Sequence, residues 1–398
     1  MAKQPMPAAL AVICVLGLLM GLPPIATDMY LPAMPAIAVS LNAGPEAVQQ
    51  TLTLFLLFFS IAQLVFGPLS DAYGRQKIVV TGLVVFALGS ALCASAKSIE
   101  ALIFYRGLQG IGGAAVIVTV PAVVRDHVSG SGFSRMMGFI MLVMGIAPLV
   151  APLLGSVIIG FVSWRYIFVW LASVALIAAA LYVYHVGETH PEHLRTRFSP
   201  QNVWANYGAV LKDRQALCYM LCSAFAIAAM FGFLAASPFI YIERYHVSAH
   251  GYAGLFMANV VLMLLVTSIS NRFVIKHGPR RMLTMAMTMI AFSSAIFAVV
   301  ALLQEPPLLL IVAGVMLFIG TAGVVNANAM ALVLTRLGAI SGSASAVAGS
   351  LRFGLGSLAP VAIGFIYDGS AQPMALVMLI CGIASISFYY LAGRLNPA

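Results

Sequence analysis

The sequence predicts an all-helical, polytopic membrane protein with twelve transmembrane helices in two six-helix repeats around a central cavity. Of its 398 residues, 62% are hydrophobic and only 8% are charged, whereas about 25% of the residues in a soluble domain are charged. The hydrophobic residues form long unbroken runs, which are typical of membrane-spanning helices and unlike the alternating ten-residue segments of a membrane β-barrel. The chain is therefore predicted to form a helical bundle within a lipid bilayer.

Twelve apolar segments are separated by loops that carry charged residues, glycine or proline. Each is long enough to cross the hydrocarbon core, which takes about 20 residues of helix. The tightest connection is Glu305 to Pro307, where two prolines must complete a turn. The predicted segments are 8–39, 47–69, 78–96, 99–124, 135–160, 164–186, 216–241, 251–271, 282–303, 307–332, 342–366 and 372–393.

One polar stretch divides these segments six and six. It predicts an N-terminal six-helix bundle at 1–186, a cytoplasmic linker at 187–215 and a C-terminal six-helix bundle at 216–398. The first apolar run, 8–39, exceeds the core of a cleavable signal peptide, so we expect it to remain as the first transmembrane helix. The five cysteines are scattered within apolar segments, a pattern that predicts neither disulfides nor a metal site.

Basic residues in the loops predict the orientation of the chain. With the N-terminus in the cytoplasm, fifteen Lys and Arg residues fall in inner loops and three, Lys97, Arg165 and Arg244, fall in outer loops. Inner loops are enriched in Lys and Arg, so we expect both termini to lie in the cytoplasm. The acidic residues divide evenly between the two sides. The net charge of +9 therefore indicates topology and contact with anionic membrane lipid, not nucleic-acid binding.

Two features recur six helices apart and indicate an internal repeat. The loop from Ser70 to Lys77 has a weaker counterpart from Asn271 to Arg281. The segments 135–160 and 342–366 are both rich in small residues, which allow helices to approach closely. Ordinary membrane packing explains either segment alone, but their equivalent positions favour two related halves.

Three ionisable residues lie well inside the predicted helices: Asp28 in the first, Arg106 in the fourth and Arg352 in the eleventh. A charge at this depth costs about 3 kcal/mol or more unless it is paired or faces water, so each residue marks a candidate functional site. The alternative is an ion pair that only fixes the packing of the helices.

The positions of Asp28 and Arg106 place them at similar depth. At 1.5 Å per residue, they lie roughly 6 Å and 9 Å outward of the membrane centre. They can therefore pair directly or through water if their helices adjoin one cavity. Asp28 would then be the one carboxylate able to take up and release a proton within the membrane. Arg352 lies near the membrane centre without an obvious acidic partner.

The loop that follows the second helix has the properties of a gate. Gly74 permits a tight reversal, Asp71 can cap a helix or attract a cation, and Arg75 holds the turn on the cytoplasmic side. We expect Asp71 to bind a basic residue or a helix end of the opposite half and so to latch the cytoplasmic gate. A turn that only sets the topology is the alternative.

These motifs resemble those of the twelve-helix drug:proton antiporters of the major facilitator superfamily. The loop from Asp71 to Lys77 is similar to the superfamily's signature between helices 2 and 3. The run from Arg106 to Gly110 is similar to its helix 4 arginine motif. The resemblance implies that Asp28 and Arg106 correspond to the coupled acid and arginine of the antiporters.

The fifth helix resembles the antiporter motif of the same family. Ala147 stands where the family usually has glycine. The resemblance implies that this helix is a hinge that lines the interface between the halves. The matching positions of the motif are Gly145, Pro148, Pro152 and Gly155.

Four further segments are similar to the bicyclomycin-resistance subfamily, which also contains phenicol exporters. The resemblance covers almost the whole chain and implies bicyclomycin, phenicols or sulfonamide-like drugs as substrates. The segments are Thr27 to Pro35, Phe133 to Met137, Ser237 to Glu243 and Leu351 to Gly354.

The remaining polar residues do not predict a catalytic site. The run from Gly110 to Ala115 imitates a dinucleotide-binding fingerprint but follows no strand, so helix packing explains it better. No cluster of metal ligands or nucleophiles falls in the apolar segments, and we expect no enzyme activity, cofactor or metal. Asn259, Asn326 and Asn328 either face the cavity or bridge neighbouring helices.

Together with the resemblance, these features predict an exporter of small, moderately polar or amphipathic drugs in the inner membrane of a bacterium. It would exchange them for protons by rocking its two halves, and it is expected to act as a monomer. A proton-linked carrier of a natural metabolite, such as an amino acid, is the main alternative; the repeat and the buried acid disfavour a channel or receptor. The expected lining of the cavity is Asp28, Tyr30, Arg106, Asn259, Asn326 and Arg352.

Overall fold

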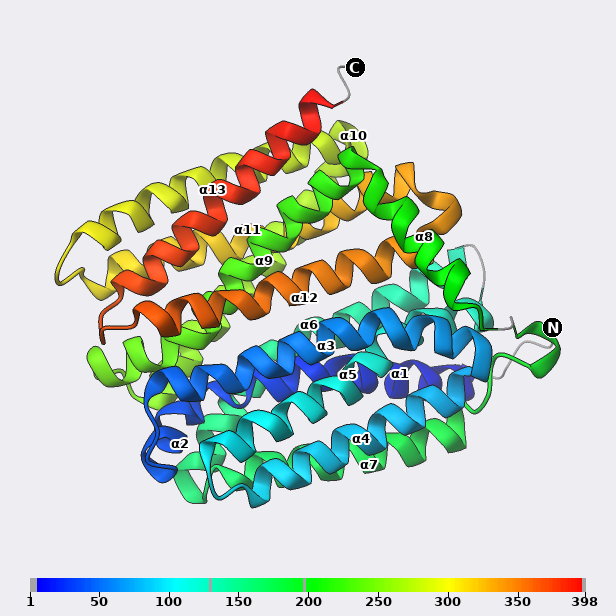
Figure 1. The fold of residues 1–398 in the computed structure, drawn as a ribbon, viewed down its shortest axis with the longest axis horizontal. Coiled ribbons are helices and arrows are strands. Elements are labelled where there is room, and N and C mark those ends of the chain that lie inside the picture. Colours follow the sequence, from blue (N-terminus) through cyan, green and yellow to red (C-terminus); the bar gives the residue numbers. More distant parts are fainter. Residues whose placement is uncertain (1–5, 129–130, 196–197, 396–398) are drawn as a thin grey trace.

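The protein is a bundle of long helices that run side by side (Figure 1). The computed structural model describes residues 6–128, 131–195 and 198–395, and these residues include no strand. The elements are α1 (Met6–Asp28), η1 (Leu31–Ala33), α2 (Met34–Ser40), α3 (Pro45–Tyr73), α4 (Arg75–Ser95), α5 (Ile99–His127), α6 (Ser131–Phe161), α7 (Arg165–His185), η2 (Glu192–Leu194), α8 (Pro200–Lys212), α9 (Arg214–Pro238), the π-helix η3 (Phe239–Arg244), α10 (Ala249–Leu302), α11 (Leu308–Arg336), η4 (Gly338–Ile340), α12 (Ser341–Ile366) and α13 (Gln372–Arg394).

The twelve predicted spans are present. Eleven helical stretches in the described residues are long and apolar enough to cross a membrane, and one of them, the 54-residue α10, contains two spans. It turns back at Gly278, whose φ of 74° and ψ of 161° are not helical (Figure 1). The turn before α11 is short, as predicted, because α10 ends at Leu302 and α11 begins at Leu308.

The first predicted helix is interrupted, which corrects the expectation of one helix over 8–39. Regular α-helix ends at Asp28 and resumes only at Met34. Pro32 lies in the first turn of η1 and Pro35 in the first turn of α2. Each proline lacks an N–H and restricts the residue before it, so neither continues a preceding helix. Asp28 therefore lies at a helix end and not within a helix.

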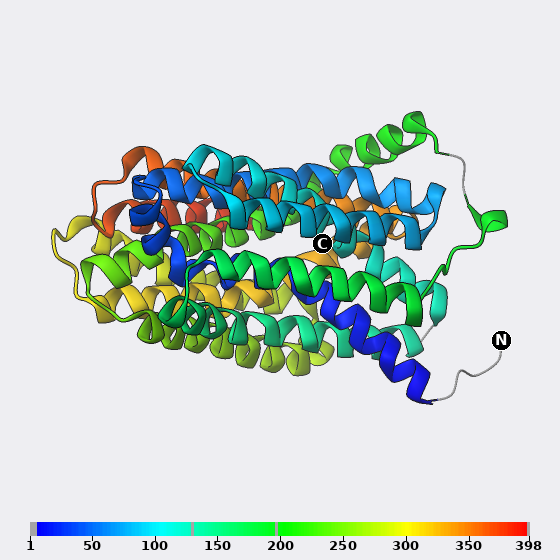
Figure 2. The same ribbon diagram turned by 90° about the horizontal axis from the view of Figure 1, so that it is seen from below.

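The predicted linker contains a helix that lies across one end of the bundle. We call this end the α8 end and the opposite one the far end. The hydroxyl of Tyr207 in α8 donates a 2.8 Å hydrogen bond to the carbonyl of Leu64 in α3, and α8 also contacts α9 and α12. Figure 2 shows α8 set apart from the parallel spans. The linker is thus attached to helices that precede it and to helices that follow it.

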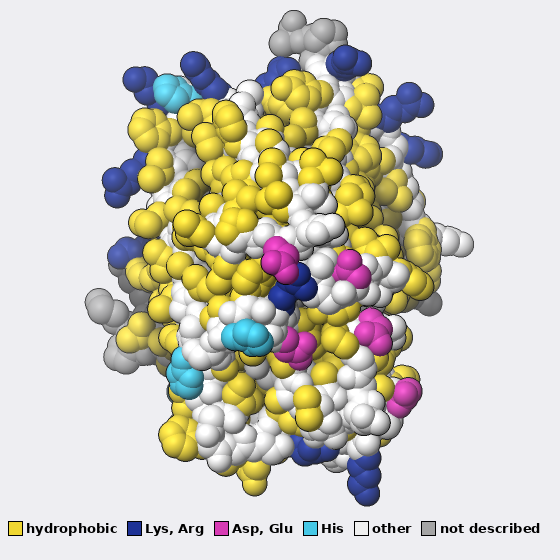
Figure 3. Space-filling view, turned by 90° about the vertical axis from the view of Figure 1, so that its left-hand side faces the viewer, with side chains coloured by type: hydrophobic (Ala, Val, Ile, Leu, Met, Phe, Trp, Pro, Cys, Tyr) yellow, Lys and Arg dark blue, Asp and Glu magenta, His cyan; other side chains and the backbone are white. Residues whose placement is uncertain are grey.

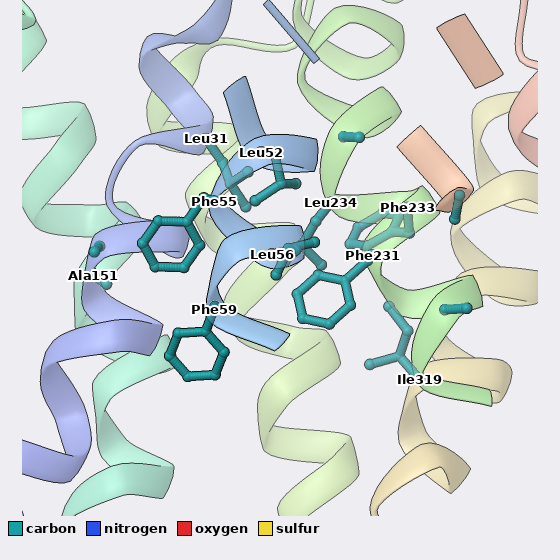
Figure 4. Close-up of a cluster of buried hydrophobic side chains, with 14 of the residues drawn as sticks. Leu31, Leu52, Phe55, Leu56, Phe59, Ala151, Phe231, Phe233, Leu234 and Ile319 are labelled. Carbon is teal, nitrogen blue, oxygen red and sulfur yellow. The ribbon is translucent and has the colours of Figure 1, made fainter. Parts of the chain in front are cut away.

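The first six and last six spans meet along two helix pairs, α3 with α12 and α6 with α10. The hydroxyl of Ser60 donates to the carbonyl of Ser350 across the first pair, at 2.8 Å. The ring of Phe353 in α12 lies 4.6 Å from that of Phe59 and 5.7 Å from that of Phe231. Figure 4 shows Phe59 of α3 beside Phe231 of α9 within the buried cluster. An aromatic layer therefore fills this part of the interface.

At the far end, short elements of the first six spans also contact the last six. The element η1 contacts α9 and α10, and α2 contacts η3. Figure 3 shows this end of the molecule, where acidic side chains surround a basic one near the middle of the face. The two sets of spans are therefore packed together at the far end.

The two predicted halves contain the same unusual turn. Gly74, after α3, has φ 100° and ψ 152°, and Gly278, within α10, has φ 74° and ψ 161°. Only glycine adopts a positive φ of this kind at little cost. The equivalent loops of the repeat thus share a backbone conformation, although their sequences match weakly.

The small residues of α6 allow it to pack closely against α1 and the break that follows it. A Cβ at Gly155 would lie 2.1 Å from the Met29 carbonyl oxygen. Ala147 lies eight residues before Gly155 in α6. A Cβ at Gly21 of α1 would lie 3.6 Å from the Cβ of Ala147, which is an ordinary van der Waals contact. The alanine that departs from the family motif is therefore accommodated by a glycine opposite.

We expect Gly155→Ala to destabilise the protein by about 1–3 kcal/mol, because the new Cβ must displace the Met29 carbonyl or move α6. The measurement is the apparent melting temperature of the detergent-purified protein. Gly160→Ala is the matched control, since Gly160 lies in the same helix and its added Cβ meets nothing within 4 Å. Equal melting temperatures for the two variants would contradict this account of α6.

Candidate functional site

Asp28 is a buried carboxylate at the break in the first span. Its residue is 5% exposed, and the hydroxyl of Thr27 donates to its Oδ1 at 3.0 Å. None of the ion pairs among the described residues includes Asp28. A carboxylate without a cation in an apolar environment favours its protonated form, since burial penalises the charge. Asp28 is therefore a buried acid without an ion-pair partner among the described residues.

Arg106 of α5 is a fully buried cation. Its Nη1 donates to the carbonyl of Ala26 at 3.2 Å and also to the side-chain oxygen of Gln109. Its Nε and Nη2 have no hydrogen-bond partner within the described ranges. Three aromatic rings surround the guanidinium and offer cation–π contacts, those of Tyr30 at 4.9 Å, Phe55 at 4.5 Å and Phe168 at 5.8 Å.

Asp28 and Arg106 do not form the direct ion pair that the sequence allowed. Their helices α1 and α5 do contact each other, but Arg106 reaches the backbone carbonyl of Ala26. The break after Asp28 explains this contact, because carbonyls in the last turn of a helix lack intrahelical partners. In this conformation the arginine caps the broken helix, and the carboxylate lies nearby without it.

Tyr30 packs beside Arg106 and does not line the pocket beside Arg352. Its side chain is fully buried, and its hydroxyl is hydrogen-bonded to that of Thr51 at 2.9 Å. Its ring centroid lies 5.8 Å from that of Phe168. Tyr30 is therefore part of the cage around the cation.

Arg352 and Asn326, which were predicted separately, are in direct contact. Arg352 Nη1 donates to Asn326 Oδ1 at 2.5 Å, and Arg352 Nε donates to the Ala348 carbonyl at 3.2 Å. The hydroxyl of Ser223 also donates to Asn326 Oδ1, at 3.1 Å. They border a small, nearly closed pocket of about 10 Å³. The lining residues are Tyr219, Met220, Ser223, Asn326, Ala329, Met330, Val333, Ala348 and Arg352.

The other two asparagines have different environments. Asn328 donates to the hydroxyl of Ser270 at 3.4 Å and to the carbonyl of Val324 at 2.8 Å, so it bridges α11 and α10. Asn259 is 2% exposed, and its Oδ1 has no partner within the described part of the chain. Neither residue lines the pocket beside Arg352.

Arg75 is the centre of a polar network at the α8 end. Its Nη1 lies 2.6 Å from Asp71 Oδ1 and donates to the hydroxyl of Ser70 at 2.8 Å. Its Nε lies 3.2 Å from Asp126 Oδ2, and its backbone N–H donates to Glu188 Oε1 at 2.9 Å. The network joins the ends of α3 and α5 to the chain that follows α7.

Asp71 does not bind the opposite half in this conformation. The ion pair it forms among the described residues is with Arg75 of its own loop, and its side chain is 51% exposed. The predicted contact between Asp71 and the opposite half is therefore absent from this conformation. Gly74 provides the turn that brings Arg75 toward the acids.

The antiporter-like motif of the fifth span, which is α6, lies at two interfaces. A Cβ at Gly145 would lie 3.3 Å from Cδ2 of Leu264 in α10, so this position faces the last six spans. Gly155, ten residues later, packs against Met29 in the first span. Pro148 and Pro152 lie between them within α6. The motif thus connects the break in the first span with the contact between α6 and α10.

The model of the Major Facilitator Superfamily matches residues 16–360. The chain belongs to the major facilitator superfamily. It is similar to a bicyclomycin resistance protein homolog of Haemophilus influenzae, with 34% identity over 96% of this chain and 96% of that protein. It is also similar to the multidrug transporter MdfA of Yersinia pestis, with 29% identity over 94% of this chain and 91% of that protein. These relatives confirm the resemblance to the bicyclomycin-resistance and multidrug transporters.

Solved structures share the fold of this transporter at low sequence identity. The nucleoside transporter NupG has a TM-score of 0.75 and 12% identity, covering 96% of this chain and 99% of that one. The xylose transporter XylE from E. coli, in a partially occluded inward open conformation, has a TM-score of 0.71 and 16% identity, covering 97% and 98%. These similarities establish the fold alone.

Sequence reasoning missed the acids that complete the Arg75 network. Asp126 and Glu188 lie at or just beyond the ends of spans on the same side as Arg75, which is the signal that could have found them. A separate ion pair joins the start of α9 to the end of α11, where Arg336 donates to Asp213 at 3.0–3.2 Å. Burial raises the pKa of Asp213, but hydrogen bonds from Arg336 and the backbone bring its pKa below the ordinary value.

We expect Asp126→Asn to lower the stability of the transporter more than Asp71→Asn. The Asp126 side chain is 17% exposed and that of Asp71 is 51% exposed. Removing the more buried acid leaves the buried Arg75 with only the exposed Asp71 as a side-chain counter-charge, at a cost of about 1–3 kcal/mol, whereas an exposed pair contributes about 0–1 kcal/mol. Apparent melting temperatures in detergent provide the comparison. A larger loss in Asp71→Asn would show that the buried pair does not dominate the network.

Proposed function

We propose that this transporter exports small, moderately polar or amphipathic drugs in exchange for protons by alternating access. The names of its relatives, a bicyclomycin resistance protein homolog and a multidrug transporter, support drug efflux. Bicyclomycin, phenicols and sulfonamide-like drugs are the proposed substrate classes. The observation that carries the proton coupling is the buried Asp28 carboxylate, which has no basic partner within the described ranges.

The environment of Asp28 supports a role in proton binding. An unpaired carboxylate at this depth is costly when charged. A closed, dry environment therefore favours its protonated form. Exposure to water on either side lowers the cost of the charged form and favours release of the proton. Arg106 is bound to the carbonyl of Ala26, two residues before Asp28, and so is held on the same broken helix as the carboxylate.

We propose that the α8 end faces the cytoplasm of a bacterial cell and the far end faces outward. The basic loops predicted to be inside lie at helix ends of the α8 end, as the charge bias of inner loops requires. Both termini would then be cytoplasmic. The contacts of η1 and α2 with the last six spans would close the outer side in this conformation.

We further propose that residues 1–186 and 216–398 move as two units. The support is the meeting of α3 with α12 and of α6 with α10, and the shared turn at Gly74 and Gly278. Closure of the α8 end would bring Asp71 to the opposite half and form the latch. Since one chain contains both units, a monomer is sufficient for transport.

The direct test uses everted membrane vesicles with a pH-sensitive dye. Addition of chloramphenicol or bicyclomycin to energised vesicles is expected to release protons from the lumen in cells that produce the transporter and not in cells without it. Drug flux without proton movement would contradict antiport. Proton movement with amino acids and with neither drug would favour the metabolite carrier.

We expect Asp28→Asn to abolish drug resistance and proton release while leaving expression and drug binding intact. Asparagine has a similar size but cannot exchange a proton. The measurement is drug susceptibility in a host without its own efflux pumps, together with the vesicle assay. Glu100→Gln, an exposed acid near the start of α5, is the control and should keep wild-type resistance. Wild-type resistance from well-expressed Asp28→Asn would remove Asp28 as the coupling site.

Export of a neutral drug is expected to be electrogenic. If Asp28 is the only proton carrier, one proton enters per cycle and one net charge moves. A potential of about 100 mV then contributes roughly 2.3 kcal/mol, and each pH unit contributes about 1.4 kcal/mol. Chloramphenicol export from proteoliposomes under a potassium-valinomycin potential, without a pH difference, measures this directly. A response to a pH step without any response to the potential would rule out the single-carboxylate mechanism.

A further inference from the structure

We infer that Arg352 and Asn326 bind the carboxylate, or a similar planar anionic group, of an amphipathic substrate. The site is the pocket between α9, α11 and α12. The inference rests on the proposed transport function and deepens it, because it names the chemical class of molecule that the pocket selects.

The first observation is the charge of Arg352. No ion pair among the described residues includes it. Its side-chain partner is the neutral Asn326, and its other partner is the backbone carbonyl of Ala348. An arginine within a membrane-spanning helix without an acidic partner is costly. A bound anion would supply the missing negative charge.

The second observation is which atoms remain free. Asn326 Oδ1 already accepts hydrogen bonds from both Arg352 and Ser223. Among the hydrogen bonds of the described residues, none uses Arg352 Nη2 or the amide nitrogen of Asn326. The unoccupied groups are therefore both N–H donors. Two donors beside a guanidinium match the two oxygens of a carboxylate, which forms short, charge-assisted hydrogen bonds.

The third observation is the nature of the pocket wall. Met220, Ala329, Met330 and Val333 provide an apolar surface next to the donors. The thioether side chains of methionine adapt to ligands of different shape. The free volume of the pocket is only about 10 Å³, roughly the space of one water molecule, so the pocket is nearly closed in this conformation. A carboxylate therefore binds there when α9, α11 and α12 move apart, and the apolar wall then contacts the adjoining part of the molecule.

The position of Arg352 connects this pocket with the interface between the two sets of spans. The next residue, Phe353, packs against Phe59 of α3 and Phe231 of α9. Two residues earlier, Ser350 accepts the hydrogen bond from Ser60. A ligand held by Arg352 therefore binds one helical turn from contacts that must change when the halves move.

The experiment compares acids with neutral molecules of the same scaffold. The full-length protein in lipid nanodiscs is titrated calorimetrically at pH 7.5 with chloramphenicol hemisuccinate and chloramphenicol, and with 4-nitrobenzoate and methyl 4-nitrobenzoate. We expect the wild-type protein to bind each acid about tenfold more tightly than its neutral counterpart. Arg352→Gln should reduce this preference to less than twofold, with the affinity for the neutral molecules changed less than twofold.

Two more substitutions separate recognition from folding. Asn326→Asp places a carboxylate on the atom that Arg352 Nη1 contacts, so it should keep the fold and still abolish the preference for acids. Arg352→Lys keeps the charge but loses the planar fork, so it should retain part of the preference. Arg272→Gln, at an exposed position of α10 that precedes the turn at Gly278 and does not line the pocket, should leave the preference unchanged.

A wild-type protein that binds the acids no better than the neutral molecules, or binds neither, would overturn the inference. Equal weakening of acids and neutral molecules by Arg352→Gln would also overturn it, because that result indicates a structural role. The titrations need no proton gradient. Absence of proton release in vesicles, together with an intact preference for acids, would therefore reject the proposed coupling and leave the binding site.

Discussion

A lipid bilayer offers no hydrogen-bond partner or counter-charge, so every polar group at depth must be satisfied by the protein itself. The break in the first span shows how this constraint shapes the structure. Pro32 and Pro35 prevent α1 from continuing past Asp28, and the carbonyl of Ala26 lies in the last turn of that helix, where carbonyls lack helical partners. Arg106 fills that vacancy, and the carbonyl of Met29 meets the glycine of α6. One interruption of backbone hydrogen bonding thus determines the surroundings of the acid, the arginine and the helix 5 motif.

Much of the fold follows from the sequence because membrane insertion imposes simple rules on it. Runs of apolar residues give the spans, and the glycine turns give the loops between them. The break at Asp28 was missed because the apolar run from residue 8 to residue 39 continues through it. A hydropathy pattern does not detect a lost backbone hydrogen bond. Pro32 and Pro35, which cause the break, were interpreted only as part of a family motif.

The site residues were predictable as types but not as partners. A buried charge is visible in the sequence, which is why Asp28, Arg106 and Arg352 were identified. The neighbours of each come from helices distant in the chain: Arg352 meets Asn326 of α11, and Arg75 meets Asp126 of α5. The crossing positions of helices decide such pairs. Depth alone therefore allowed an ion pair between Asp28 and Arg106. The pair is absent from this conformation because depth does not say which side chains face each other.

The attachment of α8 has a mechanical consequence. Only Asp213 separates α8 from α9, and the bonds to Arg336 hold that residue rigidly. The other side of α8 is anchored to α3 through Tyr207. A tilt of α9 relative to α3 would therefore strain the hydrogen bonds at the two ends of α8, because the connection is short and contains little irregular chain. If the two bundles move as proposed, the hydrogen bond between Tyr207 and Leu64 and the contacts of α8 with α12 limit how far they can separate at this end.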